Sequence, residues 1–145
     1  MDIEKSLHPL DLHPPVESAV THYRHAGLTK QIIAAAIEVH RQLGPDFLES
    51  IYERAFSREL DKNQIAHEIQ VPIRILYDDE PIGMHRLDLI VDQKVVVELK
   101  AVKQLEDVHL ATCLSYLNAS GLYVGLIINF AEARTRIRRV FRPSG

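Results

Sequence analysis

The sequence predicts an α+β fold in which helices flank a mixed β-sheet, and three patterns lead to this prediction. Between Leu28 and Leu60 apolar residues recur every three to four positions, as they do in amphipathic helices. From Ile65 the apolar period becomes two, which is typical of strands with one buried face. The nearly continuous apolar run 122–130 indicates a strand buried on both faces, inside the sheet.

Two helices are predicted first. One spans residues 28–43, with Thr29 as its N-cap and Gly44 as its stop. The other spans residues 48–63. The short Gly-Pro connection between them implies that the two helices pack as neighbours.

Five strands and one more helix complete the predicted order, ααβββαββ. A meander of three strands is expected around the turn 78–81, followed by a crossover helix and by two strands, of which the last lies at the sheet edge. The first of these strands starts at residue 65, and the remaining elements are the strands 83–91 and 94–102, the helix 106–118 with Gly121 as its stop, and the strands 122–130 and 136–141.

Composition and charge limit the class of protein. The 145 residues, 46% hydrophobic and 26% charged, are enough for one globular domain that buries roughly 70% of its unfolded surface. A net charge of -3 excludes a global basic field, so nucleic-acid binding would depend on a local patch or a metal ion. The single cysteine, Cys113, fits a reducing compartment, and no apolar run approaches the roughly 20 residues of a membrane span. We therefore expect a cytoplasmic protein without a membrane partner.

Residues 1–27 differ from the rest of the chain. They contain His-Pro steps and few large aliphatic side chains, so proline interrupts any long helix. The four histidines of this segment lack the spacing of metal ligands. We expect a mobile tail or a short helix here, and one folded domain over residues 28–145.

The segment 86–100 carries the candidate site, because its alternation fixes the register of an antiparallel hairpin. A one-residue slip would move an entire apolar set to the other face, so the apolar residues of both strands must share the core face. This register pairs Val91 with Val95, Leu89 with Val97 and Leu87 with Leu99. On the opposite face it pairs Asp88 with Glu98, with Cβ atoms about 4.5 to 5.5 Å apart. It also pairs Arg86 with Lys100.

Two carboxylates held this close repel each other. At 4 Å and an effective dielectric constant near 20, the repulsion is about 4 kcal/mol. A solvated charge cluster with Lys100 and Arg86 would offset part of it, and a divalent cation such as Mg²⁺ would offset more. Glu98 and Lys100 interrupt an otherwise apolar strand, where burial of charge without a purpose is costly, and this favours the metal interpretation.

The residues Asp88, Glu98 and Lys100 form a D-x9-E-x-K pattern that suits nuclease chemistry. Two carboxylates hold an ion that polarises a phosphodiester and lowers the pKa of a bound water. Lys100 lies two residues beyond Glu98 and on the same side, where it can orient or help deprotonate that water or stabilise charge in the transition state. The pattern alone is moderately specific.

Four motifs follow one another along the chain: Gly-Pro-Asp-Phe-Leu-Glu-Ser-Ile-Tyr at 44–52, Arg-Leu-Asp at 86–88, Val-Glu-Leu-Lys at 97–100 and Gly-Leu-Ile-Ile-Asn-Phe at 125–130. In this order they resemble the GxxExxY proteins, which are bacterial and archaeal members of the PD-(D/E)xK nuclease-like superfamily. The resemblance covers residues 28–141, and the combined motifs are far more specific than any one of them.

The resemblance implies a restriction-endonuclease-like core, with Asp88 and Glu98 as metal ligands and Lys100 as the catalytic lysine. It also implies that Glu49 is a further acidic metal ligand, brought to the site from a helix, with Tyr52 packed or hydrogen-bonded beside it. Glu49 equally fits a capping box with the aspartate three residues before it. The two roles are compatible, and both stay open.

One position departs from the family pattern H-x-A-Q-x-x-x-Y-L. Thr112 stands in place of the glutamine, and threonine is shorter and donates one proton rather than two. This weakens the expectation of full activity without touching the metal ligands. His109 and Tyr116 of the same motif, and Arg86 beside the carboxylates, are candidates for supporting the site or contacting substrate, although such residues are more often packed or on the surface.

One concentrated basic stretch lies near the C-terminus. On an edge strand its alternate arginines would share a face, where they either contact phosphates or keep the strand soluble. Both interpretations stay open for its members, Arg134, Arg136, Arg138, Arg139 and Arg142.

The sequence therefore favours a Mg²⁺- or Mn²⁺-dependent nuclease that hydrolyses phosphodiester bonds in DNA more than in RNA, with a homodimer as one option for its assembly. The alternative is a binding or assembly module that has kept the fold and lost the activity, which Thr112 and the acidic net charge favour. Metal-dependent chemistry on a small nucleotide is a third hypothesis.

Overall fold

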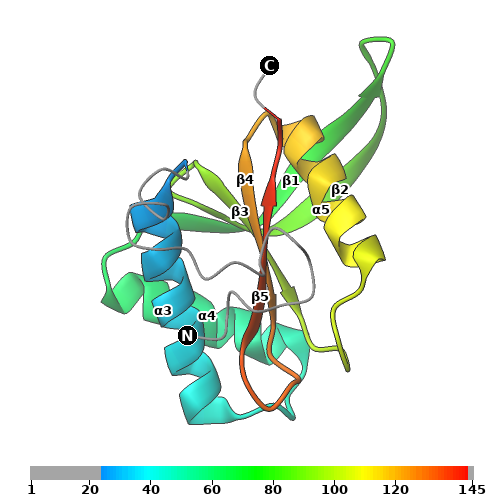
Figure 1. The fold of residues 1–145 in the computed structure, drawn as a ribbon. Coiled ribbons are helices and arrows are strands. Elements are labelled where there is room, and N and C mark those ends of the chain that lie inside the picture. Colours follow the sequence, from blue (N-terminus) through cyan, green and yellow to red (C-terminus); the bar gives the residue numbers. More distant parts are fainter. Residues whose placement is uncertain (1–23, 144–145) are drawn as a thin grey trace.

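The computed structural model describes residues 24–143, which form a five-stranded mixed sheet between two layers of helices (Figure 1). The elements follow the order ααβββαββ, and they are α3 (Ala26–Leu43), α4 (Glu49–Lys62), β1 (His67–Tyr77), β2 (Glu80–Val91), β3 (Val95–Lys100), α5 (Asp107–Ser120), β4 (Val124–Asn129) and β5 (Arg136–Phe141). The predicted fold class and element order are confirmed. Residues 1–23 of the expected tail 1–27 lie outside the described residues.

The strands lie in the sheet in their chain order, β1-β2-β3-β4-β5. The β3–β4 pair is parallel and the other three pairs are antiparallel, because α5 crosses over between β3 and β4. As predicted, β5 is an edge strand, and β4 is buried along its whole length between β3 and β5.

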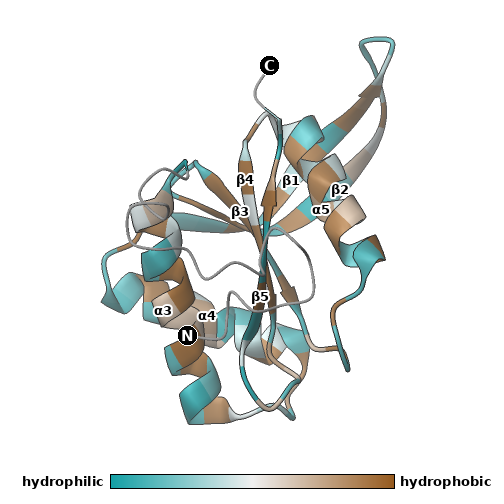
Figure 2. Cartoon of the chain, viewed as in Figure 1, coloured by the Kyte–Doolittle hydropathy of each residue, from teal (hydrophilic) through white to brown (hydrophobic). Residues whose placement is uncertain are grey.

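Each face of the sheet has its own apolar cluster. The larger one joins α3 and α4 to the sheet, and the smaller one lies under α5. Figure 2 shows the apolar residues concentrated on the central strands and on the helix sides that face them. Among residues 24–143, none of the helices combines the length and the hydropathy that a bilayer crossing requires.

The start of α3 differs from the prediction, which made Thr29 the N-cap. The helix begins at Ala26, and its N-cap is His25 in a left-handed conformation. Thr29 already lies in the first turn, where its hydroxyl donates a hydrogen bond to the Ala26 carbonyl at 3.0 Å. The predicted stop is confirmed, because Gly44 has φ +73° and its N–H donates to the His40 carbonyl.

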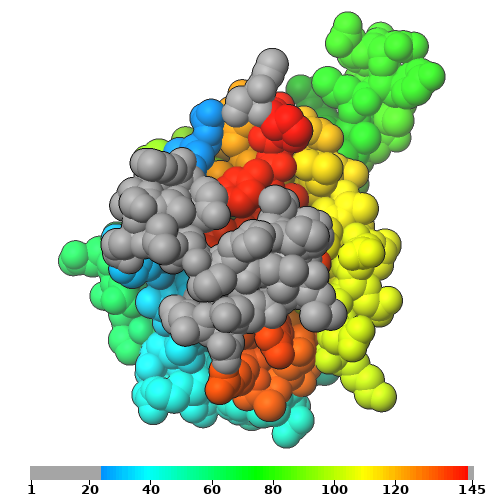
Figure 3. All heavy atoms as spheres, in the orientation of Figure 1, coloured from blue at the N-terminus to red at the C-terminus, as the bar shows by residue number. Residues whose placement is uncertain are grey.

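The β1–β2 hairpin extends beyond the other strands as a two-stranded arm (Figures 1 and 3). β2 begins at Glu80 rather than at residue 83. Asp78 and Asp79 both have positive φ, which matches a two-residue type I′ turn and explains why pairing continues to Tyr77 and Glu80.

The predicted register of β2 on β3 is confirmed for its first half. Val91 pairs with Val95 and Leu89 pairs with Val97, and the ladder then ends. Beyond this point β2 stays paired with β1, while β3 continues along β4. The expected backbone pairing of Asp88 with Glu98 is therefore wrong, as is the continuation of the ladder to the pairs Leu87–Leu99 and Arg86–Lys100.

An irregularity in β1 lies opposite Asp88. Gln70 has φ +51°, and the β1–β2 ladder passes from Ile69–Leu89 to Val71–Leu87 without pairing Gln70. Leu87 packs in the cluster under α5, whereas Leu89 packs in the cluster under α3 and α4. The prediction that Leu87 shares a face with Leu89 is thus wrong, and the change of face coincides with the left-handed backbone at Gln70.

Gly125 of β4 is, among the described glycines, the one at which an added Cβ atom would be crowded. A Cβ atom there would lie 2.7 Å from the Cys113 sulfur, which is buried on α5. We expect Gly125→Ala to lower the free energy of unfolding by about 1 to 3 kcal/mol, measured by urea denaturation.

The matched control is Gly83→Ala, because a Cβ atom there meets nothing within 4 Å. It should leave stability nearly unchanged. The double variant Cys113→Ala/Gly125→Ala should recover part of the loss that Gly125→Ala causes. A Gly125→Ala protein as stable as wild type would contradict this account of the packing.

Candidate active site

Asp88 and Glu98 exchange hydrogen bonds across the point where β2 and β3 separate. The Asp88 N–H donates to Glu98 Oε2 at 3.2 Å, and the Leu99 N–H donates to Asp88 Oδ2 at 2.8 Å. Each carboxylate thus accepts a backbone N–H of the opposite strand, where the ladder itself has ended. The two side chains are brought together as the sequence predicted, but by these bonds rather than by direct strand pairing.

Glu49 is the first residue of α4, and it reaches the same end of β3. Its Oε2 accepts the Ala101 N–H at 3.2 Å, one residue beyond Lys100. The N-cap of α4 is Leu48, and no side-chain hydrogen bond caps the helix. The capping-box interpretation of Glu49 is therefore wrong, because the helix starts at Glu49 itself instead of three residues earlier.

Tyr52 holds the start of α4 in place. Its ring is fully buried and stacks on Phe130, with centroids 4.5 Å apart and planes inclined by 5°. Its hydroxyl donates to the Gly44 carbonyl and accepts the Phe47 N–H at 3.2 Å. Tyr52 thereby fixes the loop that leads into α4, and with it the position of Glu49.

Asn129 fixes the chain just after Lys100, and the sequence reasoning gave it no role of its own. It pairs with Lys100 in the β3–β4 ladder and is fully buried. Its amide bonds both backbone groups of Val102, at 3.0 and 2.9 Å, and also donates to Glu132 at 2.8 Å. The signal in the sequence was an asparagine that ends an otherwise apolar strand.

Burial makes the paired carboxylates reluctant to ionise. Burial raises the pKa of Glu98 to about 8, and the charge of Asp88 adds to this effect. Burial also raises the pKa of Asp88, although the Leu99 N–H opposes the shift, and the charge of Glu49 contributes to it. The positive charge of Lys100 lowers both pKa values but does not cancel the effect of burial.

Glu53 is a further acidic residue at the site that the sequence reasoning missed. It lies one turn after Glu49 on α4 and accepts a hydrogen bond from the Gln70 side chain at 2.7 Å. Burial raises its pKa in spite of this bond, and the charge of Asp88 adds to the increase. The i,i+4 spacing from Glu49 was the available signal.

Of the remaining predicted site residues, Tyr116 is close enough to Glu98 and Asp88 for their charges to raise its pKa. Arg86 is exposed and donates to the Gln70 carbonyl at 3.3 Å. His109 belongs to the capping box of α5, in which its Nδ1 accepts the Glu106 N–H at 2.9 Å. Tyr116 stacks on His85, and Thr112 is half-buried on α5 without a hydrogen bond to any of the described carboxylates.

Three arginines of the basic C-terminal stretch pack against other residues of the domain. Arg138 and Arg139 are buried, and burial lowers the pKa of Arg139 to about 10. Arg142 lies over the Tyr123 ring and donates to the Leu122 carbonyl at 2.9 Å. The exposed, phosphate-binding strand face that was one interpretation of this stretch is therefore not formed by Arg138.

We call the point where β2 and β3 separate the fork. The carboxylates at the fork are oxygen donors that suit a hard divalent cation. Asp88, Glu98 and Glu49 each use one oxygen for a backbone N–H, and the second oxygen of each forms no hydrogen bond with a described residue. In the described part of the chain, however, no group of three or more His, Cys, Asp or Glu side chains is already arranged around an ion position. The chemistry of the donors fits, and the carboxylates would have to rotate to share an ion.

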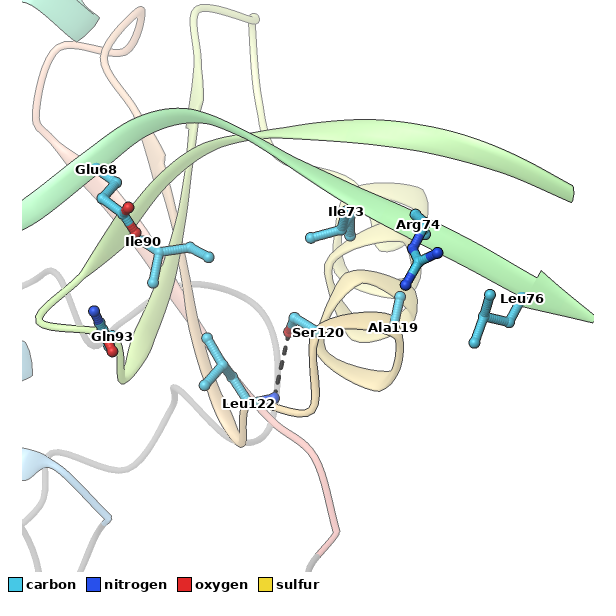
Figure 4. A pocket seen from close by; sticks show the side chains of 9 residues that line it. All are labelled: Glu68, Ile73, Arg74, Leu76, Ile90, Gln93, Ala119, Ser120 and Leu122. Atoms are coloured by element: carbon cyan, nitrogen blue, oxygen red, sulfur yellow. Dashed lines mark hydrogen bonds between the residues drawn. The ribbon is translucent and has the colours of Figure 1, made fainter. Parts of the chain in front are cut away.

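A groove on the α5 side of the hairpin is separate from these carboxylates (Figure 4). It lies between β1, β2 and the end of α5, where the Ser120 hydroxyl accepts the Leu122 N–H at 3.3 Å. The lining mixes apolar side chains with polar ones, of which Arg74, Glu68 and Gln93 are the longest.

The comparisons with known proteins agree with this fold. A family described as PD-(D/E)XK nuclease superfamily matches residues 26–140. The crystal structure of SSO0001 superposes with a TM-score of 0.52 at 17% sequence identity, over 84% of this chain. The chain spans 61% of the length of that protein, and the likeness concerns the fold alone. No curated protein matches the sequence significantly.

The raised pKa of Glu98 makes stability depend on pH. Between the ordinary glutamate pKa of 4.5 and the value of about 8 in the folded protein, the folded state binds more protons than the unfolded chain. The free energy of unfolding therefore falls as the pH rises through this window. We expect metal-free Glu98→Gln protein to melt several degrees above wild type near pH 8, and to lose this advantage near pH 4.5.

The matched control is Glu68→Gln on the exposed side of β1. Its melting temperature should follow that of wild type at both pH values. Thermal melts that show the same difference between Glu98→Gln and wild type throughout the window would contradict the titration.

Proposed function

Because the chain belongs to the PD-(D/E)XK nuclease superfamily, we propose that it hydrolyses phosphodiester bonds in nucleic acid with a divalent metal ion. The observation that carries this proposal is the hydrogen-bond exchange between Asp88 and Glu98 beside Lys100. It gathers the buried Glu98, the half-buried Asp88 and a cation at the point where β2 and β3 separate. The backbone N–H groups at this point need acceptors, but those acceptors need not be charged, so a catalytic role accounts best for the charges.

Asp88, Glu98 and Glu49 are the residues that would hold the ion, and Mg²⁺ or Mn²⁺ is the cofactor we propose. Oxygen donors of this kind suit both ions. The bound cation would supply Lewis acidity toward the phosphodiester and would offset the repulsion within the cluster.

Lys100 is the group that we assign to the reacting phosphate. It follows Glu98 by two residues on β3, and its charge acts on both Asp88 and Glu98. An ammonium group so close can stabilise negative charge that develops on phosphate oxygens, or orient the attacking water. Asn129 supports this role, because it pairs with Lys100 in the ladder and its amide fixes the backbone at Val102, just after Lys100.

Within the superfamily we infer that the chain is a GxxExxY protein that acts on DNA more than on RNA, in a reducing compartment such as the cytoplasm. Asp46 stands three residues before Glu49, where the motif of the family name has glycine. The finer assignment therefore depends on Glu49, Tyr52 and the motifs of β3 and β4.

A non-catalytic binding module is the alternative, and two observations favour it. The three carboxylates are bonded to backbone N–H groups rather than arranged around an ion. Thr112 replaces the glutamine of related sequences and forms no hydrogen bond to those carboxylates. Metal binding measured by calorimetry separates the two functions, since a module that has lost its activity need not bind Mn²⁺ through Asp88.

Asp88→Asn is the most direct test of the nuclease, because asparagine can still accept the Leu99 N–H. We expect wild-type protein to cleave DNA with Mg²⁺ or Mn²⁺, and the variant to lose at least about 100-fold in rate and to lose calorimetric Mn²⁺ binding. Asp79→Asn, in the exposed hairpin turn, is the matched control and should cleave as wild type does.

Lys100→Ala should lose cleavage at a similar scale while it still binds Mn²⁺, because the lysine is no ligand. Absence of cleavage by wild type on single-stranded DNA, duplex DNA and RNA with either ion would exclude the nuclease. Equal cleavage by wild type and Asp88→Asn protein would exclude the assigned site.

A further inference from the structure

Two stacked rings border the carboxylates on the side of α5. His85 of β2 and Tyr116 of α5 lie with ring centroids 4.1 Å apart and planes inclined by 23°, and both residues are half-buried. Burial raises the pKa of Tyr116, and the charges of Glu98 and Asp88 raise it further. The pair is therefore close enough to the carboxylates for electrostatic interaction, with Tyr116 affected by both carboxylates and His85 acting on Asp88.

The same pair adjoins the groove of Figure 4. His85 is directly opposite Ile73 in the β1–β2 ladder, and Ile73 lines that groove. Tyr116 is followed one turn later on α5 by Ala119 and Ser120, which line it as well. The stacked rings thus adjoin the groove and also lie near the carboxylates.

The chemistry of this region suits a nucleobase. Aromatic rings offer stacking surfaces that accept any base, and stacking needs a base whose face is not already covered by duplex neighbours. The groove adds apolar side chains and one cation, Arg74, together with the acidic Glu68. A base on the rings would place the adjoining phosphate toward Asp88 and Glu98.

We propose that the His85–Tyr116 stack receives an unpaired nucleobase next to the scissile phosphate, so that the substrate is single-stranded or locally unpaired nucleic acid. This inference rests on the proposed function, because it takes the phosphodiester at Asp88 and Glu98 as the reacting group. It assigns the two rings to substrate selection, whereas the carboxylates and Lys100 act on the phosphate.

The test measures binding without metal, in EDTA, so that it does not depend on cleavage. Full-length protein is titrated into a fluorescein-labelled single strand and into the matching blunt duplex, and 2-aminopurine in the single strand reports stacking by quenching. We expect His85→Ala and Tyr116→Ala to weaken single-strand binding by about tenfold and to abolish the quenching, with duplex binding unchanged.

Two further variants give the test its controls. Tyr116→Phe keeps the ring and should keep the quenching and the single-strand affinity. Tyr77→Ala removes an exposed tyrosine at the hairpin tip and should behave as wild type does. His85→Ala is the deciding variant if Tyr116→Ala fails to fold, because His85 lies on the partly exposed arm.

Equal single-strand affinity and quenching in wild-type and His85→Ala protein would overturn the proposal, as would a wild type that binds the duplex in preference. Either result would leave the proposed function standing if Mg²⁺-dependent cleavage that needs Asp88 is observed. Loss of cleavage in Asp88→Asn together with intact quenching would support both.

Discussion

The site depends on one constraint, the separation of β2 from β3 after the Leu89–Val97 pair. β2 remains with β1 and β3 continues with β4, so backbone N–H groups at the fork lose the partners that a longer ladder would give them. Two carboxylates supply those partners: Glu98 accepts the N–H of Asp88, and Asp88 accepts the N–H of Leu99. An unpaired buried N–H costs free energy, and the two carboxylates therefore serve the fold before they serve any chemistry.

The same arrangement places several acidic groups close together at the fork, where neighbouring negative charges disfavour the ionisation of Asp88 and Glu98. Burial raises the pKa of both Asp88 and Glu98, and the residues of α4 add to the field, with Glu49 acting on both and Glu53 close to Asp88. Lys100 opposes this without removing it. A proton on Glu98 relieves the repulsion, and a divalent cation would relieve it too, so the two compete for the same oxygens. The fold thus stabilises a site that gains from binding a cation.

The sequence predicted what local periodicity controls. The element order, the central position of β4 and the register of the first two β2–β3 pairs all follow from apolar spacing, and the structure agrees. The face of Leu87 was mispredicted because the left-handed backbone at Gln70 lies on the neighbouring strand β1 and leaves no mark in the alternation of residues 86–100. Glu53 was missed for a related reason, since its environment comes from Gln70 on another element. Non-local contacts decided these points, and alternation along one strand does not encode them.

Gln70 of β1 also connects α4 with β2 beside the site, through Glu53 and Arg86. Its left-handed φ is unfavourable for glutamine, and its side chain is tied to Glu53 while its carbonyl accepts from Arg86. Beyond Gln70 the hairpin packs in the cluster under α5, and His85 stacks on Tyr116. Acidic groups therefore approach the fork from one layer and aromatic rings from the other. The proposed substrate, a phosphate with its attached base, would use both kinds of contact.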